Sequence, residues 1–443
     1  MENQGKIKIP KRILGNLLNS AGAGVVPRHG LEYIAIGREK EVRALLRDLE
    51  NLSLGMGAFR FIVGKYGSGK SFVMGLMRSN AQEKGFVTAD SDLTPERRFH
   101  GTSGQGIATY RELMRNLSCR TMPDGNALPA ILTNWFSGLQ TEGITKAGFH
   151  PDDPALADYV QKEIFRIGGI LQGNVNGFDF TKALYSYYKA YISGDDELLA
   201  DALRWLRGEF NSKLQARSSR LGINSIIDDQ NWYDYLKLYA LFFRQIGYKG
   251  LTIFFDECVN LYKIPNRISR ENNYEKILSM FNDTMQGKAE GLGIFLGATP
   301  QLIEDNRRGL FSYEALKSRL ISGNLITTGK QNLLSPLIYL EVLSDNEIFA
   351  LCKRLLSLHS SYYGYISKLT DSQILDFLRI ALRKMGAHEL ITPREITRDF
   401  LNILDILFTD PTQDFNSLIQ NDQKQIKQNE DDADFFDFSE IKL

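Results

Sequence analysis

The chain has 443 residues, which is enough for one large domain or for several domains of ordinary size. Lys and Arg together number 53, as do Asp and Glu, so no net charge draws the chain to DNA or to anionic membranes. Any contact with nucleic acid must therefore depend on a local patch. Hydrophobic residues make up 43% of the chain and charged residues 24%, as in ordinary globular proteins, so composition alone indicates no function.

The cysteines and the apolar segments argue against a disulfide-rich, zinc-binding, secreted or membrane-spanning protein. Cys119, Cys258 and Cys352 lie far apart and form no C-x-x-C pair, which disfavours a disulfide framework or a zinc site. The N-terminal sequence lacks the apolar core of a secretion signal, and no run of about 18 apolar residues occurs anywhere. We therefore expect a cytoplasmic protein that is not secreted and does not span a membrane.

Short apolar runs alternate with helical patterns on both sides of the middle of the chain. Residues 39–53 and 70–81 carry apolar side chains at helical spacing, and the apolar run 59–63 between them predicts a strand. Further short runs suit buried strands at 86–89, 251–255 and 292–296. Because helical patterns separate these runs, the sequence predicts an α/β fold with a parallel core sheet.

A long segment interrupts this alternation. About 180 residues separate Ser71 from the run at 251–255, whereas a single strand–helix–strand crossover needs roughly 30. Helical periodicity dominates the segment 104–248, which predicts a large helical insertion. We expect its tryptophans to lie in the core, in preference to a base-stacking role: Trp135, Trp205 and Trp232.

The C-terminal part predicts three helices and then a polar end. Each helical pattern after residue 344 starts near a Ser, Asp or Thr suited to capping, as expected for a helical lid. The remaining sequence is polar and then acidic. The predicted organisation is an N-terminal segment with the first half of the core at 1–103, the insertion at 104–248, the second half of the core at 249–335, the lid at 336–410 and a flexible acidic tail at 411–443.

The strongest motif is GKYGSGKS at residues 64–71, which fits the phosphate-binding pattern G-x-x-x-x-G-K-S/T. It stands after a predicted strand and before a predicted helix, the context that its chemistry requires. Backbone N–H groups of such a loop surround the β-phosphate of ATP, Lys70 offsets phosphate charge and Ser71 offers its hydroxyl to Mg²⁺. The alternative is a simple glycine turn. The predicted ATP-binding residues are Gly64, Lys65, Tyr66, Gly67, Ser68, Gly69, Lys70 and Ser71.

The run at 251–255 ends in two acidic residues, Asp256 and Glu257. This is the Walker B pattern, in which one carboxylate at the tip of a strand holds Mg²⁺ and a second orients the attacking water. We assign Asp256 to the metal and Glu257 to the water. Two adjacent acids can also be a solvated strand end, but a phosphate-binding loop in the same chain favours the catalytic interpretation.

Several other residues resemble nucleotide-contacting elements of AAA+ ATPases. Thr299 follows the strand predicted at 292–296 and resembles sensor 1, although a Thr before Pro is also common in turns. Arg394 opens a predicted lid helix and resembles sensor 2, with a plain surface arginine as the alternative. Gly37 and Arg38 resemble the box II segment that packs near adenine, and a simple turn before a helix is the alternative.

One arginine resembles the box VII residue that AAA+ proteins insert into the site of a neighbouring subunit. Arg319 lies about 20 residues after Thr299. A solvated charge on a helix is the alternative, and Arg307 and Arg308 compete for the same role. The resemblance implies a homo-oligomer in which hydrolysis depends on the neighbouring protomer.

A wider resemblance covers roughly residues 8 to 405. The runs AGVVPRHGLEYIAIGRE, FRFIVGKYGSGKSF, LTIFFDECVNLY, GIFLGATP and TPREITRDFL resemble the ATP-binding proteins of bacterial BREX phage-defence systems, BrxC and BrxD. Similar ATPases accompany a helicase and a TerB-domain protein in the Shango defence system. The resemblance implies a role in defence against phage, a helicase, TerB-domain or other defence partner, and possible DNA contact. It carries the nucleotide-site roles onto Lys70, Ser71, Asp256 and Glu257, and further onto Thr299, Arg319 and Arg394.

Two classes of function remain open for such an ATPase. One is a motor or loader that acts on DNA with partner proteins, and the other is a nucleotide-gated switch that assembles a complex and turns over slowly. DNA-stimulated turnover favours the first, and ATP-dependent assembly with negligible turnover favours the second. The end of the tail, with Phe435, Phe436 and Phe438 among carboxylates, is a candidate docking peptide, and a merely solubilising tail is the alternative.

Overall fold

The computed structural model describes residues 9–171, 173, 176–321, 331–383 and 392–419. The chain divides into two compact units. The sheet unit comprises residues 40–64 and 77–339, and the lid unit comprises residues 1–39, 65–76 and 340–443. Among the helices that these described ranges contain, none has the length and apolar character needed to cross a membrane.

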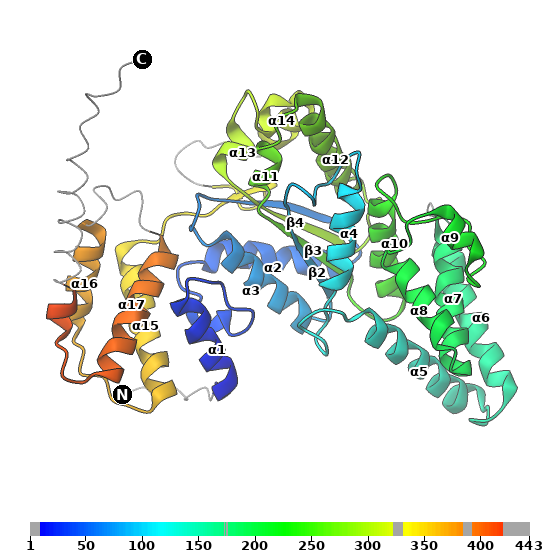
Figure 1. Cartoon of the computed structure of the whole chain (residues 1–443), viewed down its shortest axis with the longest axis horizontal. Coiled ribbons are helices and arrows are strands. Elements are labelled where there is room, and N and C mark those ends of the chain that lie inside the picture. The colour runs from blue at the N-terminus through cyan, green and yellow to red at the C-terminus, as the bar shows by residue number, and fades with distance from the viewer. Residues whose placement is uncertain (1–8, 172, 174–175, 322–330, 384–391, 420–443) are drawn as a thin grey trace, which may run out of the picture. The chain divides into compact units, whose positions relative to one another are not determined.

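A five-stranded, entirely parallel sheet forms the centre of the sheet unit, which confirms the predicted α/β class (Figure 1). Its order is β2-β3-β4-β1-β5. Four strands follow the predicted apolar runs, although β2 extends further than expected, and the short β5 was not predicted. The strands are β1 (Ala58–Val63), β2 (Val87–Asp92), β3 (Leu251–Asp256), β4 (Leu292–Ala298) and β5 (Leu337–Tyr339).

Both faces of the sheet are covered by helices, which explains why its central strands are apolar throughout. Phe61, Ile253 and Ile294 point to one face, where α10 (Trp232–Gln245) and α12 (Arg267–Met285) pack. On the other face, the rings of Phe254 and Phe295 stack with centroids 5.2 Å apart, and α2 (Glu39–Ser53) lies against β1. Successive side chains of a strand point to opposite faces of the sheet, which explains why these residues are divided between the two faces.

A buried ion pair attaches α2 to the sheet. Arg60 of β1 donates from Nε and Nη2 to the two carboxylate oxygens of Asp48, both at 2.7 Å, and from Nη1 to the carbonyl oxygen of Leu334. The side chains are only 10% and 6% exposed. Bidentate geometry of this kind compensates much of the cost of removing two charges from water.

We expect Asp48→Ala to lower the free energy of unfolding of the sheet unit by about 3–5 kcal/mol, because it leaves the Arg60 guanidinium buried without a carboxylate. The matched control is Glu271→Ala, which breaks the exposed pair with Arg267 at 2.7 Å in the same unit. That change should cost under about 1 kcal/mol. Urea denaturation followed by circular dichroism measures both, and equal midpoints for the two variants would contradict the expectation.

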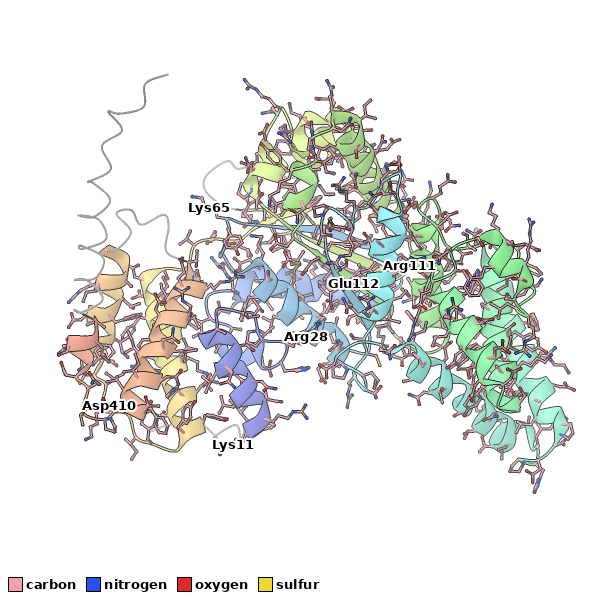
Figure 2. The ribbon with its side chains drawn as sticks, in the orientation of Figure 1. Lys11, Arg28, Lys65, Arg111, Glu112 and Asp410 are labelled. Atoms are coloured by element: carbon pink, nitrogen blue, oxygen red, sulfur yellow. The ribbon has the colours of Figure 1, made fainter. Side chains whose placement is uncertain are left out.

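The predicted helical insertion is confirmed between β2 and β3. Its helices are α4 (Gln105–Arg115), α5 (Leu128–Ala147), α6 (Pro154–Leu171), α7 (Gly177–Ser193), α8 (Asp196–Leu206), α9 (Lys213–Ser218) and α10. Figure 1 shows α5 to α9 gathered beyond α10, away from the sheet. Arg111 of α4 (Figure 2) donates to the carbonyl oxygen of Gly208 after α8 at 2.6 Å. All three tryptophans are buried, as predicted.

Shorter helices follow β3 and β4. They are α11 (Val259–Tyr262) before α12, and then α13 (Pro300–Glu304), the 3₁₀ turn η2 (Leu310–Ser312) and α14 (Glu314–Ile321). The helix α3 (Lys70–Glu83) follows β1, so the strand, loop and helix around residues 64–71 are confirmed.

The described part of the lid unit is mainly helical. Its core joins Leu17 of α1 (Lys11–Gly22) with Leu355 of α15 (Asp345–Tyr363) and Phe400 of α17 (Pro393–Thr409). The turn η1 (Leu31–Ile34) and α16 (Asp371–Arg383) complete it. Capping boxes begin α15 at Ser344 and α17 at Thr392. The N-terminal helix therefore belongs with the C-terminal helices, while the candidate docking peptide with Phe435, Phe436 and Phe438 lies outside the described residues.

Candidate nucleotide site

The loop of residues 64–71 connects β1 directly to α3. Gly64 donates its N–H to the carbonyl oxygen of Ala298 at the end of β4, at 3.0 Å. Gly67 and Gly69 have φ values of +76° and +97°, which favour glycine because a Cβ there would be strained. Lys70 turns back onto the loop and donates from Nζ to the carbonyl oxygen of Lys65, whose position Figure 2 labels, at 2.9 Å. The loop thus presents a positive charge beside backbone N–H groups at a helix N-terminus, an arrangement suited to phosphate.

Within the lid unit, the start of α17 packs closely on this loop. A Cβ at Gly67 would lie only 2.4 Å from Cγ2 of Thr392, so no larger residue fits there. Arg394 places its guanidinium 5.4 Å from the ring centroid of Tyr66 and donates from Nη1 to the Tyr66 hydroxyl at 3.3 Å. The sequence-predicted Arg394 and phosphate loop are therefore neighbours in the same unit.

Arg38 also reaches the loop. Its side chain is almost fully buried, at 4% exposure, and donates from Nη2 to the carbonyl oxygen of Ser68 at 2.8 Å. From Nη1 it donates to the carbonyl oxygen of Glu341 at 2.7 Å. Gly37 beside it has a φ of +71°, and a Cβ there would approach Glu347 to 2.7 Å. Gly37 and Arg38, which resemble the box II segment, thus lie between the loop and the start of α15.

In the sheet unit, the acidic pair stands at the carboxyl end of β3. Asp256 is the last residue of the strand, and its Oδ1 accepts the backbone N–H of Glu257 at 2.8 Å. Glu257 is exposed and has a φ of +53°, a left-handed conformation that costs free energy for a residue other than glycine. The backbone therefore turns at this point, directly after the strand ends.

Asp92 is a further acidic residue at this edge that the sequence analysis missed. It is the last residue of β2 and pairs in register with Asp256. Partial burial, followed by the negative charges of Asp256, Asp90 and Glu257, raises its pKa above the ordinary value. Crowded carboxylates are stabilised by a divalent cation, which offsets their repulsion.

Thr299 directly follows β4, three residues after Leu296, which is the register partner of Phe255 in β3. Its side-chain oxygen accepts the N–H of Leu302 at 3.3 Å, which makes Thr299 the N-cap of α13. The hydroxyl hydrogen of a capping Thr can still be donated to another acceptor. The local turn role and the predicted sensor role are therefore compatible.

The three candidate arginines for the neighbour's site differ in their surroundings. Arg319 is exposed on α14 and donates to Asn282 Oδ1 at 3.1 Å and to the Ala315 carbonyl oxygen at 2.7 Å. Arg308 is half-buried, donates to the carbonyl oxygens of Tyr262 and Ile264, and lies 5.3 Å from the Tyr262 ring centroid. Arg307 is exposed, and its backbone N–H is capped by Asp305. Arg308 is therefore the least exposed of the three candidates, while Arg319 and Arg307 are both exposed.

A family model described as BREX system ATP-binding protein BrxC/D matches residues 9–423. The chain belongs to this family. No curated protein matches the chain. A BREX system ATP-binding protein binds ATP in a phage-defence system, and the match begins before α1 and ends beyond α17, so it takes in both units.

The acidic edge carries few protein groups that could bind a metal ion. Among the described residues, no group of three or more His, Cys, Asp or Glu side chains is arranged to enclose a metal ion. Mg²⁺ in ATP-binding proteins uses one or two protein ligands together with phosphate oxygens and waters. At the acidic edge of the sheet unit, the carboxylate that would serve as such a ligand is that of Asp256.

Proposed function

We propose that this BREX-type ATP-binding protein is a Mg²⁺-dependent ATP hydrolase of the AAA+ class. The observation that supports it most strongly is the strand, glycine loop and helix at 58–83, together with strand β3 of the same parallel sheet, which ends in Asp256 and is followed by Glu257. ATP hydrolysis by such proteins needs a phosphate cradle, a metal ligand and a group that orients water. Each of the three has a candidate here.

In this proposal, each residue acts on a different part of the reaction. Lys70 and the loop N–H groups bind the phosphates, while Ser71 and Asp256 hold Mg²⁺. Glu257 orients the attacking water, and Thr299 donates its hydroxyl hydrogen to the γ-phosphate or to that water. Arg394 binds the γ-phosphate after leaving Tyr66. Each contact stabilises charge or position in the transition state, which is how phosphoryl transfer is accelerated.

The hydrolysis cycle would drive a motor, a loader or a nucleotide switch within the defence complex. We propose that the chain assembles as a homo-oligomer and acts with a helicase, a TerB-domain protein or another component of the system. Turnover measured with and without DNA separates these roles. Stimulation by DNA supports a motor or loader, and ATP-dependent assembly with negligible turnover supports a switch.

Lys70→Ala should reduce ATP affinity by roughly 10-fold or more, because it removes a charge-assisted contact with the phosphates. Equilibrium binding of ATP with Mg²⁺ measures the loss. Lys84→Ala is the control, because Lys84 is exposed just after α3 ends at Glu83. Equal affinity in Lys70→Ala and the wild type would remove residues 64–71 from the nucleotide site.

A further inference from the structure

Arg38 has contacts that a surface or turn residue would not have. The guanidinium is 4% exposed, and its two terminal nitrogens donate to two backbone carbonyl oxygens far apart in sequence, those of Ser68 and Glu341. Both distances, 2.8 and 2.7 Å, are typical of strong charge-assisted hydrogen bonds. Arg38 therefore fixes the direction in which the Ser68 carbonyl points.

That carbonyl determines the direction of a phosphate-binding N–H group. The peptide joining Ser68 to Gly69 is planar, so the Ser68 C=O and the Gly69 N–H point in opposite directions. Gly69 accepts the first helical hydrogen bond of α3, from the N–H of Val73 at 2.9 Å, so its own N–H is among the unpaired donors at the helix N-terminus. Holding the carbonyl on Arg38 turns the Gly69 N–H away from Arg38 and toward the cradle.

Glycine makes this constraint necessary. Gly69 has a φ of +97° and Gly67 a φ of +76°, and glycine populates several backbone regions with similar ease. Without an anchor, the peptide between Ser68 and Gly69 can rotate at little cost and turn its carbonyl dipole toward the phosphate. We propose that Arg38 is a positioning residue that orients the phosphate-binding loop through the Ser68 carbonyl, in contrast to a role in contacting the base.

Within the lid unit, the second hydrogen bond of Arg38 connects the loop to the segment before α15. Glu341 lies four residues before Asp345, where α15 begins, and Gly37 packs on Glu347 of that helix. A phosphate that orders the loop therefore also orders the Arg38 contact with the segment leading into α15. This role rests on the proposed nucleotide site, because an orienting contact has an effect only where phosphate binds.

The test compares two ligands, ADP and inorganic pyrophosphate, in the full chain with Mg²⁺. Arg38→Lys keeps the positive charge but cannot donate from two nitrogens in a fixed fork. We expect this substitution to weaken the binding of ADP and of pyrophosphate by a similar factor of about 10 or more, because the phosphate-binding loop of the variant loses its fixed orientation. Without nucleotide, backbone amides of residues 67–72 should exchange hydrogen faster than in the wild type.

Arg47→Lys is the matched control, because Arg47 is an exposed arginine on α2. Arg38→Gln is measured as a second variant. If one of the two Arg38 variants fails to fold, the ligand binding of the other still tests the proposal. Weaker ADP binding with unchanged pyrophosphate binding would overturn the proposal in favour of a base contact, and unchanged binding of both would remove any role. A wild type that binds neither ligand would remove the proposed nucleotide site itself.

Discussion

Glu257→Gln should retain ATP binding while ATP hydrolysis falls by a factor on the order of 10² to 10⁴, the range expected when a positioned acid–base group is lost. The amide has nearly the shape of the carboxylate but cannot accept a proton from water or orient it with a negative charge. Asp256 is unchanged, so the predicted metal ligand remains. Phosphate release under saturating ATP measures the loss, and equilibrium binding measures what is retained.

Asp256→Asn is the informative companion, because it changes the neighbouring acid of the same strand end. Removing the proposed metal ligand should make hydrolysis require higher Mg²⁺ concentrations, whereas Glu257→Gln should leave the Mg²⁺ dependence of ATP binding unchanged. Turnover of Glu257→Gln at the wild-type rate would show that another residue orients the water. In that event Asp92, the register partner of Asp256, is the next acid to test.

The elements that could be predicted were those specified by local sequence. Apolar runs of four or more residues predicted β1 to β4. The capping residues Ser344 and Thr392 indicated where their helices begin, because a capping side chain bonds to the backbone of its own turn. The strand β5 has only three residues, Leu337–Tyr339, and is defined by pairing with β1. Such a strand depends on a distant neighbour, so its own sequence carries too little signal.

The same limit applies to the site. The loop at 64–71 and the acids at 256 and 257 are contiguous motifs with a recognised chemistry, so their candidates were found from the sequence. Arg38 bonds to residues 30 and 303 positions away, and neither partner uses a side chain. Asp92 becomes part of the acidic edge only through strand pairing. Hydrogen bonds to backbone atoms and the pairing register of strands do not depend on a recognisable residue pattern, so a single sequence does not reveal them.

Arg319→Ala should nearly abolish ATP hydrolysis while ATP binding is retained. An arginine supplied by a neighbouring subunit offsets charge that develops only in the transition state, and related phosphoryl-transfer systems gain about 10³ or more in rate from it. Arg319 is suited to this role because it is exposed on α14. Its contacts with Asn282 and Ala315 would be exchanged for the neighbour's γ-phosphate.

The arginine acts in trans only if hydrolysis depends on assembly, so specific activity of the wild type should rise with protein concentration. Mixing provides the sharper measurement. Arg319→Ala lacks the arginine but keeps Glu257, and Glu257→Gln lacks the acid but keeps Arg319, so mixed interfaces contain one complete site. Combining the two inactive variants should therefore restore part of the activity, whereas either variant mixed with itself should not.

Arg307→Ala is the comparison, because Arg307 is the other exposed candidate and should retain most of the wild-type rate. Turnover that is independent of concentration, together with a fully active Arg319→Ala, would exclude the trans role and leave Arg307 to be examined by the same mixing. If Arg319→Ala is inactive but mixing restores nothing, the arginine acts within its own subunit. The dependence on concentration and the mixing result together therefore determine which protomer supplies the charge.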